Sequence, residues 1–351
     1  MGGHKEVCLA CGDVLHAYNS CRNRHCPKCQ TLTKAQWLSD RKSELLPLPY
    51  FHCVFTLPHM LNGIVLANKR VLLSMLFSAA SQTLLEFGRN NLGGKVGFTM
   101  VLHTWDQQLG PHFHVHCVIP AGALSDDKKR WIEGRSDYLF PVKALSVVFR
   151  GKFVDALEQA FAKGELNATG SDADDVASER FSSLVQRLRT VDWVVYAKKP
   201  FAGPEQVLDY LGRYTHRVAI SNNRILDVND NQVSFSYRDR RHGNSSCTAT
   251  LDAHTFIARF LLHVLPDGFM RIRHYGFLAS RYKTENLRTC RVLLGQPADL
   301  PARPKFTVAQ WLKTLLGIDV NRCPACGKGP LQRTRLYPRL AAYQEKSIDT
   351  S

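Results

Sequence analysis

Long apolar runs are missing from this chain. The longest, around Val71–Ala80, is interrupted by Ser74 and Ser78, whereas a membrane-spanning helix needs about 20 consecutive apolar residues. Residues Met1–Glu6 lead directly into cysteines rather than into the apolar segment of a secretory signal. The sequence therefore predicts a cytosolic protein without a membrane partner.

Acidic residues are scarce, and a phosphate-binding loop is absent. The 351 residues include 30 Asp and Glu against 46 Lys and Arg, which gives a net charge of +16. Such an excess attracts polyanions, although it does not separate DNA from RNA or from an anionic membrane. The sequence Gly93-Gly94-Lys95 continues with Val96 and so does not match Gly-x4-Gly-Lys-Ser/Thr. We expect no nucleotide cofactor.

Length and composition predict two or three domains, because the chain is 44% hydrophobic and can bury a large core. We divide it into a cysteine-rich module at 1–46, a main domain at 47–300 with a mobile loop at about 164–178, and a basic tail at 301–351. Residue patterns in the main domain predict the following elements: strands at 50–57, 95–103 and 193–197, helices within 61–87, 143–163 and 179–190, and a hairpin of 224–228 with 232–238.

Eleven cysteines in a cytosolic chain indicate metal ligands or buried thiols rather than disulfides. Two Cys-x2-Cys pairs lie close enough in sequence to share one tetrahedral Zn²⁺: Cys8 with Cys11, and Cys26 with Cys29. Cys21 and His25 lie between the pairs, so a different ligand subset or a second metal stays open. A third pair, Cys323 with Cys326, stands alone near the C-terminus and offers only half a site.

Three histidines alternate in Gly110-Pro-His-Phe-His-Val-His-Cys-Val-Ile-Pro120, which is expected to be a strand. Alternate strand residues share a face, so His112, His114 and His116 converge. Antiparallel pairing with the strand at 95–103 would bring His103 close to them. Imidazoles suit several divalent ions, and oxygen ligands together with a phosphate would favour Mg²⁺ or Mn²⁺.

Two tyrosines lie one helical turn apart in Tyr210-Leu-Gly-Arg-Tyr214, on one face of a predicted helix. Aromatic pairs at this spacing often only pack together. Here Arg213 and Arg217 flank them, and guanidinium groups at that spacing suit phosphate contacts. In the cysteine-rich module, Arg22 and Arg24 are likewise available for DNA phosphates.

These motifs together resemble one family. His114-Val-His116 resembles the histidine–hydrophobe–histidine motif of the HUH endonucleases, and the segment from Pro111 to Gly122 is similar to that of rolling-circle transposases. The insertion sequence 91 family fits best. Three further segments resemble it in the same order along the chain: Tyr18–Gln30, Tyr210–Ile220 and Arg271–Phe277. Because Phe113 is also hydrophobic, both His112-Phe113-His114 and His114-Val115-His116 have the histidine–hydrophobe–histidine pattern. The family motif favours His114 and His116.

The resemblance implies an α+β fold, with an HUH-endonuclease-like central antiparallel sheet, flanking helices and a small zinc-binding module in front. It implies a transposase in which Tyr210 or Tyr214 attacks single-stranded DNA at the ends of its element, leaving a 5′-phosphotyrosine and a free 3′-OH, before transfer to target DNA. A Mg²⁺ or Mn²⁺ ion bound by His114 and His116 would assist this cleavage. The third ligand is either His103 or Gln206, and His112 would complete the metal shell or bind DNA.

Two other functions stay open. A plasmid replication initiator or relaxase would use the same chemistry, although the zinc module argues against it. A decayed transposase that binds DNA through zinc without cleaving it is the other alternative, and the intact histidines and tyrosines argue against that. A two-metal carboxylate nuclease is less attractive, because no compact acidic cluster accompanies the histidines.

Overall fold

The protein is described here by a computed structural model, and two compact units make up the chain. The first unit combines residues 1–35 with 305–351, and the second is formed by 36–304. The predicted division differs, because the C-terminal tail belongs with the cysteine-rich module. The structure describes the following residues: 2–21, 23, 25–26, 30–167, 174–198, 206, 208, 212, 219–239, 242–301, 306–317 and 319–336.

The first unit is built on a small antiparallel sheet with the strand order β13-β1-β2. Its central strand comes from the N-terminus and one of its neighbours from the C-terminus. A helix, α9, begins with a capping box in which Thr307 and Gln310 bond to each other's backbone. The bounds are β1 Gly3–Cys8, β2 Val14–Tyr18, α9 Val308–Leu316 and β13 Leu331–Leu336.

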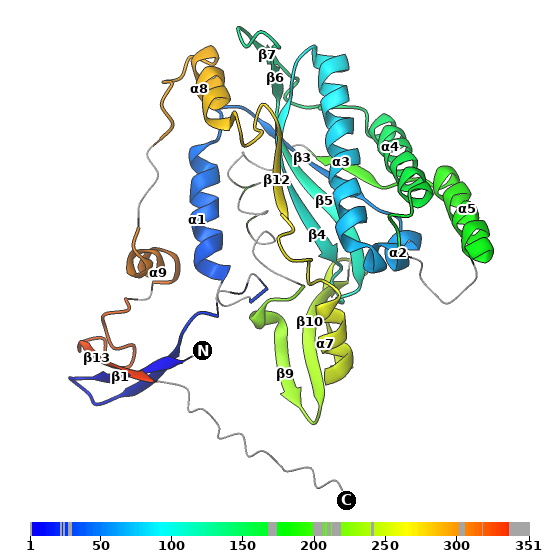
Figure 1. Cartoon of the computed structure of the whole chain (residues 1–351). Coiled ribbons are helices and arrows are strands. Elements are labelled where there is room, and N and C mark those ends of the chain that lie inside the picture. Colours follow the sequence, from blue (N-terminus) through cyan, green and yellow to red (C-terminus); the bar gives the residue numbers. More distant parts are fainter. Residues whose placement is uncertain are drawn as a thin grey trace, which may run out of the picture. The chain divides into compact units, whose positions relative to one another are not determined.

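A five-stranded antiparallel sheet with the order β12-β4-β5-β3-β8 forms the centre of the second unit (Figure 1). Its fold class is therefore the predicted one, α+β with a central antiparallel sheet. The predicted strand at 50–57, the strand at 95–103 and the histidine strand are all present. The bounds are β3 Tyr50–Thr56, β4 Gly97–Trp105, β5 Pro111–Pro120, β8 Val195–Lys198 and β12 Ile272–Gly276.

One face of this sheet is packed with apolar side chains. Phe55, Phe98 and Val115 are fully buried there, and each alternates with residues that point to the opposite face. Helices α3 and α4 cover the apolar face, and α5 lies outside α4 (Figure 1). The helix bounds are α1 Gln30–Ser43, α2 Asn62–Ala67, α3 Lys69–Phe87, α4 Val142–Ala162, α5 Asp174–Thr190, α7 Ala253–Leu261 and α8 Lys283–Leu293.

One helical segment, Lys69–Leu92, is long and apolar enough to cross a membrane by length and composition. Nine residues of α3, among them Leu76 and Phe77, are buried within the protein. All of these except Ser81 and Thr83 belong to the hydrophobic core that the helix shares with the sheet and α4. The apolarity of this segment is thus accounted for by core packing.

A second sheet, with the order β9-β10-β11, packs with α7 against the loop that joins β4 to β5. The predicted hairpin is confirmed, and its turn residues Asp230 and Asn231 both have positive φ, as a type I′ turn requires. Short strands β6 and β7 pair beyond β5. The bounds are β6 Gly122–Leu124, β7 Trp131–Glu133, β9 Ile225–Asn229, β10 Gln232–Asp239 and β11 Ser245–Asp252.

One predicted boundary is wrong. The mobile loop expected at about 164–178 overlaps α5, which begins at Asp174 rather than at 179. The run Asp-Asp-Val-Ala-Ser at 174–178 lacks a helical apolar periodicity and so favours a loop in the sequence, yet acidic residues also suit the first turn of a helix. Residues 168–173 lie outside the described part of the chain.

Gly276 should be needed at the end of β12, where it pairs with Gly97 of β4. Its φ is +63°, and a Cβ there would collide with the Val96 carbonyl. We expect Gly276→Ala to destabilise the protein by well over the roughly 1–2 kcal/mol that a left-handed conformation alone costs. Gly295→Ala is the matched control, because Gly295 has a φ of +69° in open space. Urea unfolding measures both, and equal losses would contradict the steric explanation.

Candidate functional site

Three histidine nitrogens converge on the second face of the central sheet. His103 of β4 pairs directly with His114 of β5, and His116 follows two residues later on the same face. The Nε2 atom of His116 lies 2.9 Å from Nδ1 of His103 and 3.1 Å from Nε2 of His114. All three residues are buried. The sequence predicted that strand pairing would bring His103 close to the histidine strand, and the structure confirms this position.

The ring orientation of His114 can be assigned from its hydrogen bond. Its Nδ1 lies 3.0 Å from the carbonyl oxygen of His112, which can only accept, so Nδ1 carries the proton. In a neutral ring the Nε2 atom then has a lone pair directed at the other two nitrogens. Burial, reinforced by the nearby His114 and Arg271, holds the pKa of His103 well below its usual range. Its ring is therefore neutral at pH 7.

This donor set fits a divalent cation. Adjacent ligands of an octahedral ion at about 2.1 Å are about 3.0 Å apart, close to the 2.9 and 3.1 Å between these nitrogens. Neutral imidazoles are metal ligands because their lone pairs are available. His103, His114 and His116 could thus hold a metal ion together.

The structure adds a fourth histidine that the sequence reasoning missed. His52 of β3 places its Nε2 2.8 Å from Nδ1 of His116, and the two ring planes are within 6° of parallel. Burial, together with Lys198, lowers the pKa of His52 to about 4. A signal was present: His52 and Thr56 are four residues apart in an otherwise apolar strand and therefore share a face, which indicates a polar site on that face.

Other predicted site residues lie elsewhere or outside the described residues. His112 is on the same strand but packs its ring against His59 and His114 rather than joining the three converging nitrogens. Gln206 is an exposed helical residue. The following predicted residues lie outside the described part of the chain: Tyr210, Tyr214, Arg22, Arg24, Arg213, Arg217 and Cys29.

The loop between the histidine strands is tied down at several points. The Asp106 carboxylate accepts backbone N–H bonds from Gln108 and Gly110 at 2.8 and 2.7 Å. Arg224 donates to the carbonyl oxygen of Gln107 at 2.5 Å, and Arg259 donates to that of Gln108 at 3.2 Å. These bonds fix the turn, and the turn fixes the register that places His103 opposite His114.

A separate cluster of four cysteines lies in the first unit. Sγ of Cys8 is 3.6 Å from Sγ of Cys326, and Sγ of Cys11 is 3.8 Å from Sγ of Cys323. Tetrahedral zinc with Zn–S bonds of about 2.3 Å separates its sulfurs by about 3.8 Å. Backbone N–H groups of Lys328 and Gly329 lower the pKa of Cys326 to about 6, which favours the thiolate that zinc binds. The four thiols therefore fit a structural Zn²⁺.

This grouping differs from the predicted one. Cys8 and Cys11 were expected to share zinc with Cys26 and Cys29, but the structure completes their set with the C-terminal pair, which is no longer alone. The two pairs form similar turns, because Gly12 and Gly327 follow the second cysteine of each pair with φ of +75° and +69°. The shared sequence Cys-x-Ala-Cys-Gly was the signal that could have identified the partners. Cys21, His25 and Cys26 are outside this set.

Zinc content provides a test of the observed grouping. We expect Cys326→Ser to lose one zinc ion per chain, because three thiolates and a hydroxyl make a poorer tetrahedral site. Cys247→Ser, at a partly buried cysteine of β11, is the matched control and should retain full zinc. Elemental analysis of the purified proteins gives the metal-to-protein ratio. Unchanged zinc in Cys326→Ser would favour the pairing with Cys26 and Cys29.

Known proteins match this chain over nearly all of its length. A family model described as a putative transposase matches residues 97–286, more than half of the chain. Another, described as a transposase zinc-binding domain of the insertion sequence 91 type, matches residues 1–57. The putative transposase y4qJ of Sinorhizobium fredii is 47% identical over 96% of this chain and 86% of its own length. The transposase for insertion sequence element IS801 of Pseudomonas savastanoi pv. phaseolicola is 27% identical, over 91% and 75%.

The first family model spans both histidine strands and β12, and the second spans β1, β2 and the first cysteine pair. Transposases of this kind act on DNA, in agreement with the excess of positive charge. The chain belongs to the insertion sequence 91 family of transposases.

Proposed function

We propose that this transposase moves its element by rolling-circle transposition, cutting single-stranded DNA and transferring it through a 5′-phosphotyrosine. The observation that carries the proposal is the convergence of the His103, His114 and His116 nitrogens within one buried cluster. Mg²⁺ or Mn²⁺ bound there would polarise the scissile phosphate and offset its developing charge. His103 is favoured over Gln206 as the third ligand, because its Nδ1 faces His116.

Tyr210 or Tyr214 would be the nucleophile. The tyrosine oxygen forms a bond to phosphorus while the bond to the 3′ oxygen breaks, so the tyrosine loses a proton and the leaving 3′ oxygen gains one. Free tyrosine has a pKa of about 10 and needs activation, and the cationic Arg213 and Arg217 beside it in sequence would supply an electropositive surrounding. The adduct conserves the energy of the broken bond, so rejoining needs no ATP. A second tyrosine would allow a second cleavage before the first adduct is resolved.

His52 would act as a positioning residue for His116. A metal-binding histidine usually donates its other ring N–H to an acceptor, which fixes its tautomer and orientation. Here His116 Nδ1–H would donate to His52 Nε2 at 2.8 Å, so that His116 Nε2 would offer its lone pair to the ion. The lowered pKa of His52 supports this role, because a neutral ring can accept that bond.

The zinc-binding module would recognise the element ends. Arg22 and Arg24 would contact phosphates, which set the register for a few base contacts. The cytosol is the expected location, where element and target DNA are both accessible.

A covalent adduct tests the proposed chemistry. Purified protein incubated with a single-stranded oligonucleotide from its own element and Mn²⁺ should give a denaturant-resistant adduct. Tyr210→Phe and Tyr214→Phe should show which tyrosine acts first, and the double variant should give none. Tight DNA binding without any adduct in the wild type would contradict the proposal and favour a non-catalytic DNA-binding protein.

Metal affinity tests the role of His52. His52→Leu removes the acceptor of the His116 bond and should weaken Mn²⁺ binding by about 10–100-fold. His52→Gln offers a side-chain oxygen as a replacement acceptor and should recover part of the loss. His254→Ala, at an exposed histidine of α7, is the control. Calorimetric titration with Mn²⁺ measures all three, and wild-type affinity in His52→Leu would exclude a positioning role.

A further inference from the structure

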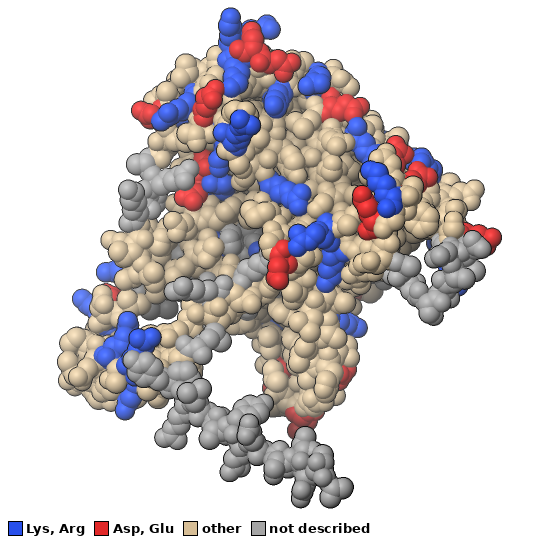
Figure 2. Space-filling model, in the orientation of Figure 1, with Lys and Arg blue, Asp and Glu red and all other residues tan. Residues whose placement is uncertain are grey.

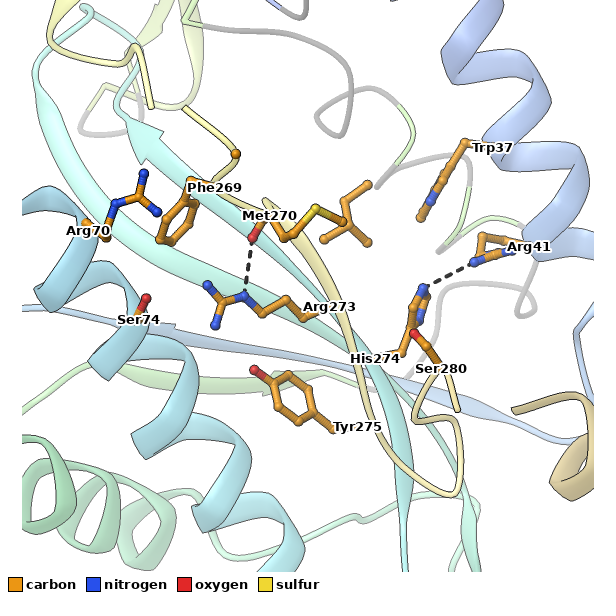
Figure 3. A pocket seen from close by; sticks show the side chains of 12 residues that line it. Trp37, Arg41, Arg70, Ser74, Phe269, Met270, Arg273, His274, Tyr275 and Ser280 are labelled. Atoms are coloured by element: carbon orange, nitrogen blue, oxygen red, sulfur yellow. Dashed lines mark hydrogen bonds between the residues drawn. The ribbon is translucent and has the colours of Figure 1, made fainter. Parts of the chain in front are cut away.

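A hollow of about 720 Å³ lies at the edge of the central sheet, beside β12. Its walls come from α1, α3 and β12, all within the second unit. Figure 3 shows Arg70 and Ser74 on one side of β12, and Trp37 and Arg41 on the other. The volume falls within the roughly 300–1,000 Å³ of typical ligand sites.

The hollow is cationic. Arg41, Arg70 and Arg273 line it, and none of the described residues in its wall is Asp or Glu. Arg70 donates to the carbonyl oxygen of Asp267 at 2.6 Å, and Arg273 to that of Met270 at 3.2 Å, so main-chain oxygens hold both guanidiniums without neutralising them. Lys and Arg side chains also lie on this face over β12 and the adjoining end of α3, with acidic atoms beside them (Figure 2). Such a surface favours a polyanion.

Arg41 and Lys283 share one acidic partner, Glu44, so this group of three side chains keeps a net positive charge. The Arg41 guanidinium is 2.8 Å from Glu44, which also accepts Lys283 at 2.8 Å, so two cations surround one buried carboxylate. Arg41 also bonds to Nε2 of His274 at 3.2 Å, and Nδ1 of His274 is 2.9 Å from Thr99 Oγ1. Burial, then Lys283 and Arg41, lower the pKa of His274 to about 3, so it accepts this bond as a neutral ring. Arg41 is thereby held at the wall.

Flat and apolar side chains lie between these cations. Trp37 is partly buried in the wall of the hollow. Met270, just before β12, is 66% exposed and points toward the side of Trp37 (Figure 3). The Arg273 guanidinium lies 4.2 Å from the Phe77 ring centroid and 5.0 Å from that of Phe269, which stacks it in place. Aromatic rings beside fixed cations are the combination that binds unpaired bases and their phosphates.

The hollow borders the face that carries the histidines. Ile272 of β12 pairs with Val101 of β4, which pairs with His116 of β5. Two strand spacings separate Ile272 from His116, or about 10 Å. Arg273 alternates with Ile272 and lies on the face covered by α3, so a nucleic-acid strand seated in the hollow would pass around the sheet edge formed by β12 to reach the three histidines.

We propose that this hollow binds nucleotides of single-stranded DNA that flank the cleaved phosphate, with a base stacked on Trp37 and phosphates contacted by Arg70 and Arg273. The inference rests on the proposed function for the identity of the DNA. An unpaired strand is the occupant because its bases are free to stack on a side chain, whereas bases in a duplex are already stacked on each other.

Binding measurements test the hollow without requiring cleavage. With a fluorescent single-stranded oligonucleotide from the element end, Trp37→Leu should weaken binding about tenfold or more, and Trp37→Phe should recover most of it because the ring is retained. Arg70→Ala should weaken binding and lower the slope of log K against log salt by about one. Arg187→Ala, on the exposed side of α5, is the matched control and should bind like the wild type.

Photocrosslinking gives a readout that does not depend on variants folding. An oligonucleotide carrying 5-iododeoxyuridine should crosslink to wild-type peptides that contain Trp37 or Met270. Wild-type binding by Trp37→Leu and Arg70→Ala, with crosslinks elsewhere, would overturn the inference. Displacement of the oligonucleotide by inorganic phosphate or a mononucleotide at equal concentration would also overturn it, in favour of a small-anion site.

The adduct assay separates the two proposals. If the wild type forms the tyrosine adduct while the hollow variants bind normally, the strand follows another path and the proposed function stands. If the hollow variants lose binding but no tyrosine adduct forms, the hollow is a strand-binding site in a protein whose proposed chemistry fails.

Discussion

The antiparallel register of β4 and β5 is the constraint on which the rest of the site depends. It places His103 opposite His114, and strand alternation adds His116 on the same face. A shift of β5 by one residue would turn His114 and His116 into the apolar face and place Phe113 and Val115 on the face of His103 instead. The register is held from outside the sheet, because the joining turn is bonded by Asp106 and clamped by Arg224. Arg224, just before β9 and bonded to the Ser236 carbonyl of β10, thus links the second sheet to this turn.

Burying several histidines on one sheet face makes their rings available to bind a cation, but it lowers the stability of the fold at acidic pH. Burial lowers the pKa of His103, His52 and His274, which keeps the rings neutral. Neutral rings can offer lone pairs to a cation or accept hydrogen bonds, as His274 does from Arg41. The sign of the linkage follows: as the pH falls below about 6.5, the unfolded chain takes up these protons first, so folding stability declines toward acid.

Local patterns predicted much of this fold. Alternation identified the histidine strand, the Asn-Asp-Asn turn identified the hairpin, and the loop after residue 103 was enough to infer that His103 reaches His114. Contacts between distant segments carry no periodicity, so the sequence did not reveal that β3 brings His52 to His116. The partnership of Cys8 with Cys326 is a still longer-range contact, and nearness along the chain misleadingly favoured Cys26. For Tyr210 and Tyr214 the motif remains the sole basis, since both lie outside the described residues.

The four-cysteine cluster joins two segments that lie far apart along the chain. Cys11 and Cys323 are 312 positions apart, yet their sulfurs are 3.8 Å from each other. During synthesis Cys8 and Cys11 leave the ribosome long before Cys323 and Cys326, so the four thiols can come together only after the later pair has been made. A chain interrupted anywhere before Cys323 would retain the histidine strands but never assemble this centre. The arrangement therefore makes synthesis through Cys326 a condition for assembling the four-cysteine cluster.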